Sequence, residues 1–225
     1  MLTQYDLHTA DLVTAAKKYY SRYAGSPAGR YIEHRGLATV ADRFKLGYVS
    51  DPSIGHEAYR GRLAIPYLRP VGVATIRFRC IADTCVMTPD GAYREPHEEA
   101  HGKHPKYLGL PGHPPMLFNT WALIHYSPYI GLGEGEFDAM ASEVAGVPAA
   151  SLPGVSSWQE EFAPPFLGFE KVFSLGDGDQ AGRQFNEKNC GRLPNVVPVD
   201  QSDGYDTNRF VKEFGGEAFR KKLGV

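Results

Sequence analysis

Short apolar segments alternate with helix-like segments through the last hundred residues of this 225-residue chain. The apolar segments, which predict strands, span residues 129–133, 149–152, 172–175 and 196–199. The segments with helical character span residues 136–144, 158–162, 180–188, 208–214 and 217–223. Strands that are separated by helices form parallel βαβ units. We therefore expect a Rossmann-like domain with a largely parallel sheet over residues 126–225.

The first half has a different pattern, which predicts a mixed α+β subdomain over residues 1–125. Helical spacing of apolar residues predicts a helix at 11–22, and a second helix at 27–34 begins with Ser26 as its N-cap. A further helical turn is expected at 40–44. Two strand-like segments at 62–68 and 71–79 predict a hairpin that turns at Pro70. A long loop is expected at 89–115, so the whole chain is predicted to be an α/β protein.

Acidic residues follow three of the strands predicted in the second half. Glu134 follows the first strand, Asp177 and Asp179 follow a second, and Asp206 follows the last. Ligands of open α/β sheets bind at the carboxyl ends of the strands, so these side chains are expected to converge. Crowded carboxylates repel one another unless a divalent cation neutralises them, and oxygen ligands favour Mg²⁺ or Mn²⁺.

The order of these acidic motifs resembles the Toprim domain, and specifically the DnaG-type primases of bacteria and phages. The motifs are Glu-Gly-x-x-Asp from Glu134, Asp-Gly-Asp-x-Ala-Gly-Arg from Asp177 and Gly-x-Asp-x-Asn from Gly204. The resemblance implies two or more Mg²⁺ or Mn²⁺ ions. It implies catalytic roles for Glu134, Asp177 and Asp179, and metal binding by Glu134, Asp138, Asp177, Asp179, Asp206 and Asn208.

Two of these roles have alternatives. Glu134 is either a metal ligand or a proton-transfer group. Asn208 stands where many such primases carry a second aspartate, and an amide there is either a metal ligand or a helix N-cap.

Basic segments of the first half resemble the RNA-polymerase core of the same primases. They lie at 31–37, 60–66 and 104–108. Arg60 and Arg62 alternate on a predicted strand, so both guanidinium groups are expected to point the same way. Arg35 has an alternative as a cation at a helix C-terminus, and any isolated arginine has one as a solvated surface residue. The resemblance implies that template or nucleotide is bound by Arg35, Arg60, Arg62, Arg79, Lys106 and Arg183.

Four histidines, His97, His101, His104 and His113, lie in the predicted loop, and Cys80 and Cys85 lie shortly before it. Cys-x₄-Cys followed by His-x₂-His is not a tight zinc signature, so a polar, flexible loop is the favoured interpretation and zinc is not expected. A small metal site in this region is the alternative.

The formal net charge is −2, so any attraction for nucleic acid has to come from a local basic surface. Three cysteines suit a reducing compartment, and neither a signal peptide nor an apolar membrane span is visible. We expect a soluble protein of the cytoplasm, which for a phage protein is that of the host.

Together these patterns predict a DNA primase, a DNA-directed RNA polymerase of the nucleotidyltransferase class. Its partners would be single-stranded DNA and ribonucleoside triphosphates. DnaG-type primases also carry a zinc module and a helicase-binding tail, whose motifs are not found here, so the replicative helicase or a separate zinc-containing protein is a further expected partner. The alternatives are a metal-dependent Toprim nuclease and a catalytically degenerate DNA-binding accessory protein of replication.

Overall fold

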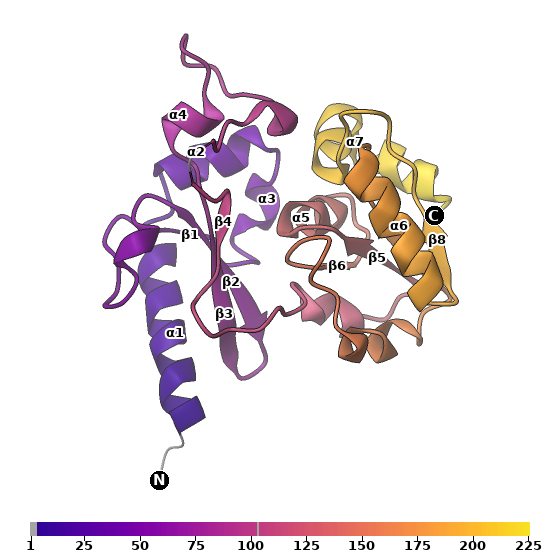
Figure 1. The fold of residues 1–225 in the computed structure, drawn as a ribbon, viewed down its shortest axis with the longest axis horizontal. Coiled ribbons are helices and arrows are strands. Elements are labelled where there is room, and N and C mark those ends of the chain that lie inside the picture. The colour runs from indigo at the N-terminus through magenta and orange to yellow at the C-terminus, as the bar shows by residue number, and fades with distance from the viewer. Residues whose placement is uncertain (1–3, 103) are drawn as a thin grey trace. The chain divides into compact units, whose positions relative to one another are not determined.

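The computed structural model describes residues 4–102 and 104–225, with side chains described from residue 11 onward. The chain divides into two compact units, Met1–His113 and Pro114–Val225 (Figure 1). The boundary predicted at 125/126 lies inside the second unit. One reason is that the backbone of Phe118 forms an antiparallel bridge with Ser151, and the Phe118 ring is buried.

The first unit is built around an antiparallel sheet in the order β1-β2-β3-β4. The hairpin predicted from the sequence is confirmed as β2 and β3, and Ser26 caps α2 by accepting a hydrogen bond of 3.1 Å from the backbone N–H of Gly29. The elements of this unit are α1 (Gln4–Tyr20), α2 (Pro27–His34), α3 (Ala38–Ala41), β1 (Gly47–Tyr48), η1 (Glu57–Tyr59), β2 (Leu63–Arg69), β3 (Gly72–Arg79), α4 (Asp83–Val86), η2 (Pro96–Glu98) and β4 (Tyr107–Leu108).

Helix α1 packs on this sheet and closes the core of the first unit (Figure 1). Tyr19 of α1 is 1% exposed and meets the ring of Phe78 edge-on. Gly47 lets the helix and strand β1 approach closely, because a Cβ at this position would lie 2.6 Å from the Cβ of Tyr19. Any larger residue at Gly47 would push α1 away from the sheet.

The second unit contains the predicted parallel sheet, with strands in the order β6-β5-β7-β8. The helix predicted at 158–162 is a single 3₁₀ turn, and the two final helices are one element interrupted at Gly215, where φ is 84°. The elements are η3 (Thr120–Ile124), β5 (Tyr129–Gly133), α5 (Glu136–Val144), β6 (Ala149–Ser151), η4 (Glu160–Phe162), η5 (Pro164–Phe166), β7 (Lys171–Leu175), α6 (Gln180–Arg192), β8 (Val196–Pro198) and α7 (Thr207–Leu223).

The two central strands of this sheet, β5 and β7, are almost entirely buried. Ile130, Leu132 and Val172 are each 0% exposed, which is typical of a parallel sheet covered on both faces. An α-helix follows three of the four strands of this unit: α5 follows β5, α6 follows β7, and α7 follows β8 (Figure 1). Among the described residues no helix combines the length and apolarity needed to cross a bilayer.

Candidate active site

Glu134 and Asp177 lie side by side at the carboxyl edge of the parallel sheet. Strands β5 and β7 are neighbours in register, with Gly133 opposite Leu175, so the residues that follow them leave the sheet at the same edge. The backbone N–H of Asp177 donates a hydrogen bond of 2.8 Å to a carboxylate oxygen of Glu134. Two acidic residues that are 43 positions apart in sequence thus meet at the place where α/β proteins bind ligands.

The Asp177-Gly178-Asp179 turn is shaped by glycines that permit close backbone packing. A Cβ on Gly182 would lie 2.0 Å from the carbonyl oxygen of Asp177, so only glycine fits there without a shift. Asp179 is the N-cap of α6, and its carboxylate accepts a hydrogen bond of 2.8 Å from the backbone N–H of Gly182. The turn therefore presents Asp179 at the positive end of the α6 dipole, which favours a negative charge.

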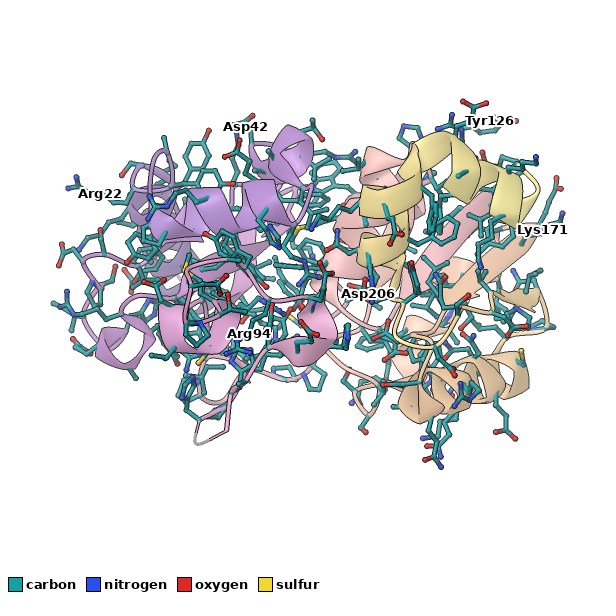
Figure 2. All side chains as sticks on the ribbon, turned by 90° about the horizontal axis from the view of Figure 1, so that it is seen from above. Arg22, Asp42, Arg94, Tyr126, Lys171 and Asp206 are labelled. Atoms are coloured by element: carbon teal, nitrogen blue, oxygen red, sulfur yellow. The ribbon has the colours of Figure 1, made fainter. Side chains whose placement is uncertain are left out.

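Asp206 reaches the same region from the loop before α7. The backbone N–H of Gly178 donates to the carbonyl of Tyr205 at 2.7 Å, which ties this loop to the Asp177 turn. Asp206 is the N-cap of α7 and accepts a hydrogen bond from the backbone N–H of Arg209; Figure 2 labels Asp206 at the start of this helix. Asn208 is 1% exposed and lies inside the first turn of α7. The alternative of Asn208 as an N-cap is therefore wrong, because Asp206 holds that position.

Asp138 is buried in the first turn of α5, beneath the end of β5. It is 6% exposed, and one of its carboxylate oxygens accepts a 3.1 Å hydrogen bond from the backbone N–H of Gly135. Burial raises the pKa of Asp138 far above its usual range, and the charges of Asp177, Asp206 and Glu134 raise it further. The hydrogen bond from Gly135 lowers this pKa only in part. Without a cation nearby, these effects favour the neutral form of Asp138 over the ionised form.

Crowding of the carboxylates is also visible in the titration of Glu134. Burial raises the pKa of Glu134 to about 7; the hydrogen bond from the Asp177 backbone opposes this shift, and the charges of Asp179 and Asp206 add to it. A glutamate with a pKa near 7 exchanges its proton easily at neutral pH. The side chain can therefore take up a proton or accept a cation, and the structure is compatible with both predicted roles.

The donor set suits a hard divalent cation. Glu134, Asp138, Asp177, Asp179 and Asp206 supply only oxygen atoms, and the raised pKa values show that negative charge here lacks compensation. Mg²⁺ is a cation of this kind, and it usually retains several water ligands beside those that a protein supplies.

Three of the predicted basic residues converge in the first unit on one glutamate that the sequence did not single out. The carboxylate of Glu99 lies 2.6 Å from Arg79, 3.4 Å from Arg35 and 3.4 Å from Lys106. Burial alone would raise the pKa of Glu99, but Arg79 and Lys106, with a hydrogen bond from Tyr31, lower it to about 2. Glu99 is therefore an anion around which the cations are organised.

Arg35 and Arg79 are not displayed on a surface. Each is 3% exposed, and Arg79 also donates to the hydroxyl groups of Tyr107 at 2.6 Å and Tyr31 at 3.0 Å. Lys106 is different, because its side chain is 39% exposed. The structure thus separates a buried ionic framework, formed by Arg35 and Arg79, from a lysine that can still reach a solvent-borne phosphate.

Arg60 and Arg62 line one hollow of about 460 Å³ in the first unit. Their predicted place on a strand is wrong: β2 begins at Leu63, and Gly61 between the two arginines has φ of 78°. Both arginines reach this hollow because the chain turns at Gly61. Alternation of side chains along a strand, which the prediction assumed, is not the reason. Arg60 donates to the carbonyl of Ser50 at 2.8 Å and Arg62 to that of Pro105 at 3.1 Å. In the second unit, Arg183 is an exposed residue of α6 that forms a 3.5 Å ion pair with Asp203.

The chain resembles known proteins in sequence and in fold. No family model matches the chain. It is 36% identical over 170 residues to the gene 57 protein of Mycobacterium phage D29, an alignment that covers 73% of this chain and 99% of the phage protein. The chain belongs to the family of this phage protein. It is also 27% identical over 222 residues to the DNA primase of Aquifex aeolicus, covering 87% of this chain and 44% of that primase.

Solved structures of DnaG-type primases share its fold. The crystal structure of the zinc-binding and RNA polymerase domains of the Aquifex aeolicus primase matches with a TM-score of 0.77 at 24% identity, covering 99% of this chain and 62% of that one. A DnaG primase catalytic domain bound to single-stranded DNA matches with a TM-score of 0.69 at 19% identity, covering 97% of this chain and 80% of that one. The chain thus has the fold of the DnaG primase catalytic core and spans less than half of the full Aquifex primase.

Proposed function

We propose that this chain is the catalytic core of a primase, which synthesises short RNA primers on single-stranded DNA from ribonucleoside triphosphates with Mg²⁺ or Mn²⁺. The observation that carries the proposal is the group of acidic residues at the carboxyl edge of β5 and β7, in a chain with the DnaG core fold. The second unit would then be a Toprim domain, as its motif order suggests.

Phosphoryl transfer asks a protein mainly to position its substrates and to neutralise charge. Glu134, Asp177 and Asp179 would hold the divalent cations, with Asp138, Asp206 and Asn208 around them. Bound cations would stabilise the charge that develops on the transferred phosphoryl group. Glu134 would bind a cation in its deprotonated form, or in a second role accept the proton of the attacking primer hydroxyl, since its pKa is about 7.

The first unit would supply nucleic-acid and nucleotide contacts. Arg60 and Arg62 line a common hollow, and guanidinium groups bind phosphate oxygens in a bidentate manner. Lys106 would add a point charge, while Arg35 and Arg79 would act through the Glu99 framework that holds Lys106. Arg183 on α6 would contribute from the second unit. A replicative helicase or a separate zinc-containing protein would be a further partner in template choice.

The direct test is incubation of the purified chain with single-stranded templates, all four ribonucleotides and Mg²⁺ or Mn²⁺, followed by separation of labelled RNA. We expect short RNA products from the wild type and a loss of at least a hundredfold in Asp179→Asn. Asparagine is as good an N-cap as aspartate, so this variant removes the charge and keeps the start of α6. Far-ultraviolet circular dichroism and thermal unfolding close to those of the wild type would verify that the fold is unchanged.

A Toprim nuclease is the second candidate, because the same acidic site can bind cations for phosphodiester cleavage. The same assay separates it: a nuclease shortens the labelled template and yields no RNA, with loss of cleavage in Asp179→Asn. An accessory protein without catalysis would bind the template and leave both template and ribonucleotides unchanged. Either outcome in place of RNA synthesis contradicts the primase proposal.

A further inference from the structure

Four potential metal ligands meet at one point in the first unit. The thiols of Cys80 and Cys85 and one ring nitrogen each of His101 and His104 all lie within 4.8 Å of one another. The Nε2 atom of His104 is 3.0 Å from the sulfur of Cys80 and 3.5 Å from that of Cys85. Ligand atoms of a tetrahedral zinc site are separated by roughly 3.3–3.8 Å, as follows from Zn–N and Zn–S bonds of about 2.0–2.3 Å.

Backbone contacts bring these residues together from both ends of a long connection between β3 and β4. Cys80 directly follows β3, and its N–H donates to the carbonyl of Lys106 at 2.8 Å. Cys85 lies in α4, and its carbonyl accepts from the N–H of Ala100 at 3.0 Å. The segment from 80 to 106, which includes the labelled Arg94 of Figure 2, thus returns to its own starting point and carries the two histidines there.

His101 is prepared to act as a ligand through Nδ1. Its Nε2 atom lies 3.1 Å from a carboxylate oxygen of Glu99, which is itself fixed by Arg79 at 2.6 Å. A proton on Nε2 leaves the lone pair on Nδ1, and that atom is buried with no hydrogen-bond partner among the described residues. A carboxylate that orients the second nitrogen of a histidine is the usual arrangement behind a metal ligand.

Neither a disulfide nor hydrogen bonds among the four side chains would give a partner to every ligand atom of this group. A disulfide bond between Cys80 and Cys85 would leave the buried Nδ1 of His101 without a partner, and an unpaired buried polar atom destabilises the folded state. One metal ion with four ligands satisfies both sulfurs and both imidazoles. Two thiolates with two imidazoles favour Zn²⁺ among common divalent ions, and four protein ligands make a closed, structural site.

We propose that Cys80, Cys85, His101 and His104 bind one structural Zn²⁺ ion. Binding would release one proton from each of the two thiols, giving two sulfur–zinc and two nitrogen–zinc bonds. The ion would fix the two ends of the connection between β3 and β4 to each other. It would thereby hold Glu99 in place beside Arg79. It would also fix one wall of the hollow of Arg60 and Arg62, because Cys80 and His104 line that hollow too. The proposal departs from the expectation that spacing gave for these residues, and it does not depend on the reaction that the chain catalyses.

The test begins with the wild-type chain, produced in zinc-supplemented medium and purified under reducing conditions without chelators. Elemental analysis is expected to give about one zinc per chain, and native mass spectrometry is expected to show the mass of one zinc less two protons. After replacement by Co²⁺, the chain is expected to show the visible bands of a tetrahedral site and thiolate-to-cobalt charge transfer in the near ultraviolet.

Matched variants then locate the ion. Cys80→Ser, Cys85→Ser and His101→Asn are each expected to lose at least nine-tenths of the bound zinc. Cys190→Ser removes the exposed thiol of the second unit, and His97→Asn removes an exposed histidine of the same connection; both are expected to retain it. If a ligand variant does not fold, the charge-transfer intensity of the cobalt-loaded Cys190→Ser variant still counts the thiolate ligands, and two are expected.

Three results would overturn the proposal. The first is a wild-type chain that binds neither zinc nor cobalt stoichiometrically. The second is a Cys80–Cys85 disulfide, found by peptide mapping of protein prepared under the same reducing conditions. The third is equal loss of zinc from Cys190→Ser or His97→Asn and from the ligand variants, which would indicate adventitious binding.

Discussion

The protonation of Glu134 couples the acidic site to the stability of the protein. Its pKa of about 7 lies above the usual value for a glutamate, so the folded state binds the proton more tightly than the unfolded state. The protonated side chain is therefore stabilising relative to the ionised one, and stability is lost as pH rises from about 4.5 through 7. Replacement by a neutral isostere removes this loss.

We predict that Glu134→Gln raises the free energy of unfolding at pH 8 by about 1–3 kcal/mol in magnesium-free buffer. The amide oxygen can still accept the hydrogen bond from the Asp177 backbone. Urea unfolding at pH 5 and pH 8 measures the effect, which should shrink at the lower pH. Glu187→Gln, on the exposed side of α6, is the control and should change neither value. Equal effects of the two variants at pH 8 would contradict the assignment of the shift to Glu134.

Glu99 has the opposite electrostatic role, because it is the buried countercharge of several cations. Its side chain is 1% exposed, and its removal would leave Arg35 and Arg79 buried without their carboxylate. We predict that Glu99→Gln lowers the free energy of unfolding by about 3–5 kcal/mol, the range for breaking a buried ion pair. Urea unfolding at pH 7 measures this, and Glu98→Gln, an exposed neighbour, should cost little.

The pH dependence gives a second measurement for Glu99. Its pKa is lowered to about 2, so its contribution is present above the unfolded value of about 4.5 and is lost as pH falls through 2. Wild-type stability should therefore fall across this window, and Glu99→Gln should fall less. Parallel curves for the two proteins would show that another carboxylate carries the acid sensitivity.

Glu134 and Glu99 differ in how far the sequence could predict them. Glu134 directly follows an apolar strand and lies in a motif with Asp138, so both pattern and resemblance indicate it. Glu99 lies in a polar connection rich in charge, and its contacts join it to Tyr31 and Arg79 at sequence separations of 68 and 20. No local periodicity encodes such contacts. They depend on how the 80–106 connection folds back. For the same reason the spacing of Cys80, Cys85, His101 and His104 favoured a flexible loop and left a metal site only as the alternative.

At the scale of elements, local patterns sufficed where apolar residues repeat. The βαβ alternation predicted the parallel sheet, and Ser26 predicted the start of α2. The prediction that Arg60 and Arg62 lie on a strand is wrong because Gly61 adopts a left-handed conformation. The chain turns there, and β2 begins only at Leu63. The sequence Arg-Gly-Arg is compatible with a strand and with a turn, so the conformation of its glycine is decided by the surrounding packing.

A substitution at Gly178 tests the contact between the loop after β7 and the loop after β8. A Cβ there would lie 1.9 Å from the carbonyl oxygen of Ser202, so one of the two loops has to move. We predict that Gly178→Ala lowers the free energy of unfolding by about 1–3 kcal/mol and reduces activity at least tenfold, because Asp177 and Asp206 separate. Gly191→Ala is the control, since nothing lies within 4 Å of its added Cβ and alanine favours the helix. Loss of activity in both variants would remove the argument for this loop contact.

At the scale of the whole molecule, charge is divided between the two units. Residues 1–113 contain 15 Lys and Arg against 11 Asp and Glu, a formal charge of +4, whereas residues 114–225 contain 9 against 15, a formal charge of −6. The overall value of −2 conceals this division. Attraction for a single strand should therefore depend on particular basic residues of the first unit and not on net charge.

The salt dependence of binding distinguishes these two possibilities. We predict that Arg60→Gln with Arg62→Gln lowers the affinity for single-stranded DNA and reduces the slope of log K against log salt by roughly 1.4, or about 0.7 for each lost phosphate contact. Lys171→Gln with Lys188→Gln removes the same charge from exposed positions of the second unit and should leave the slope unchanged. Fluorescence anisotropy of a labelled oligonucleotide from 50 to about 200 mM salt measures both slopes. Equal reductions would mean that net charge governs binding, and a wild-type slope in both pairs would return Arg60 and Arg62 to the role of ordinary surface residues.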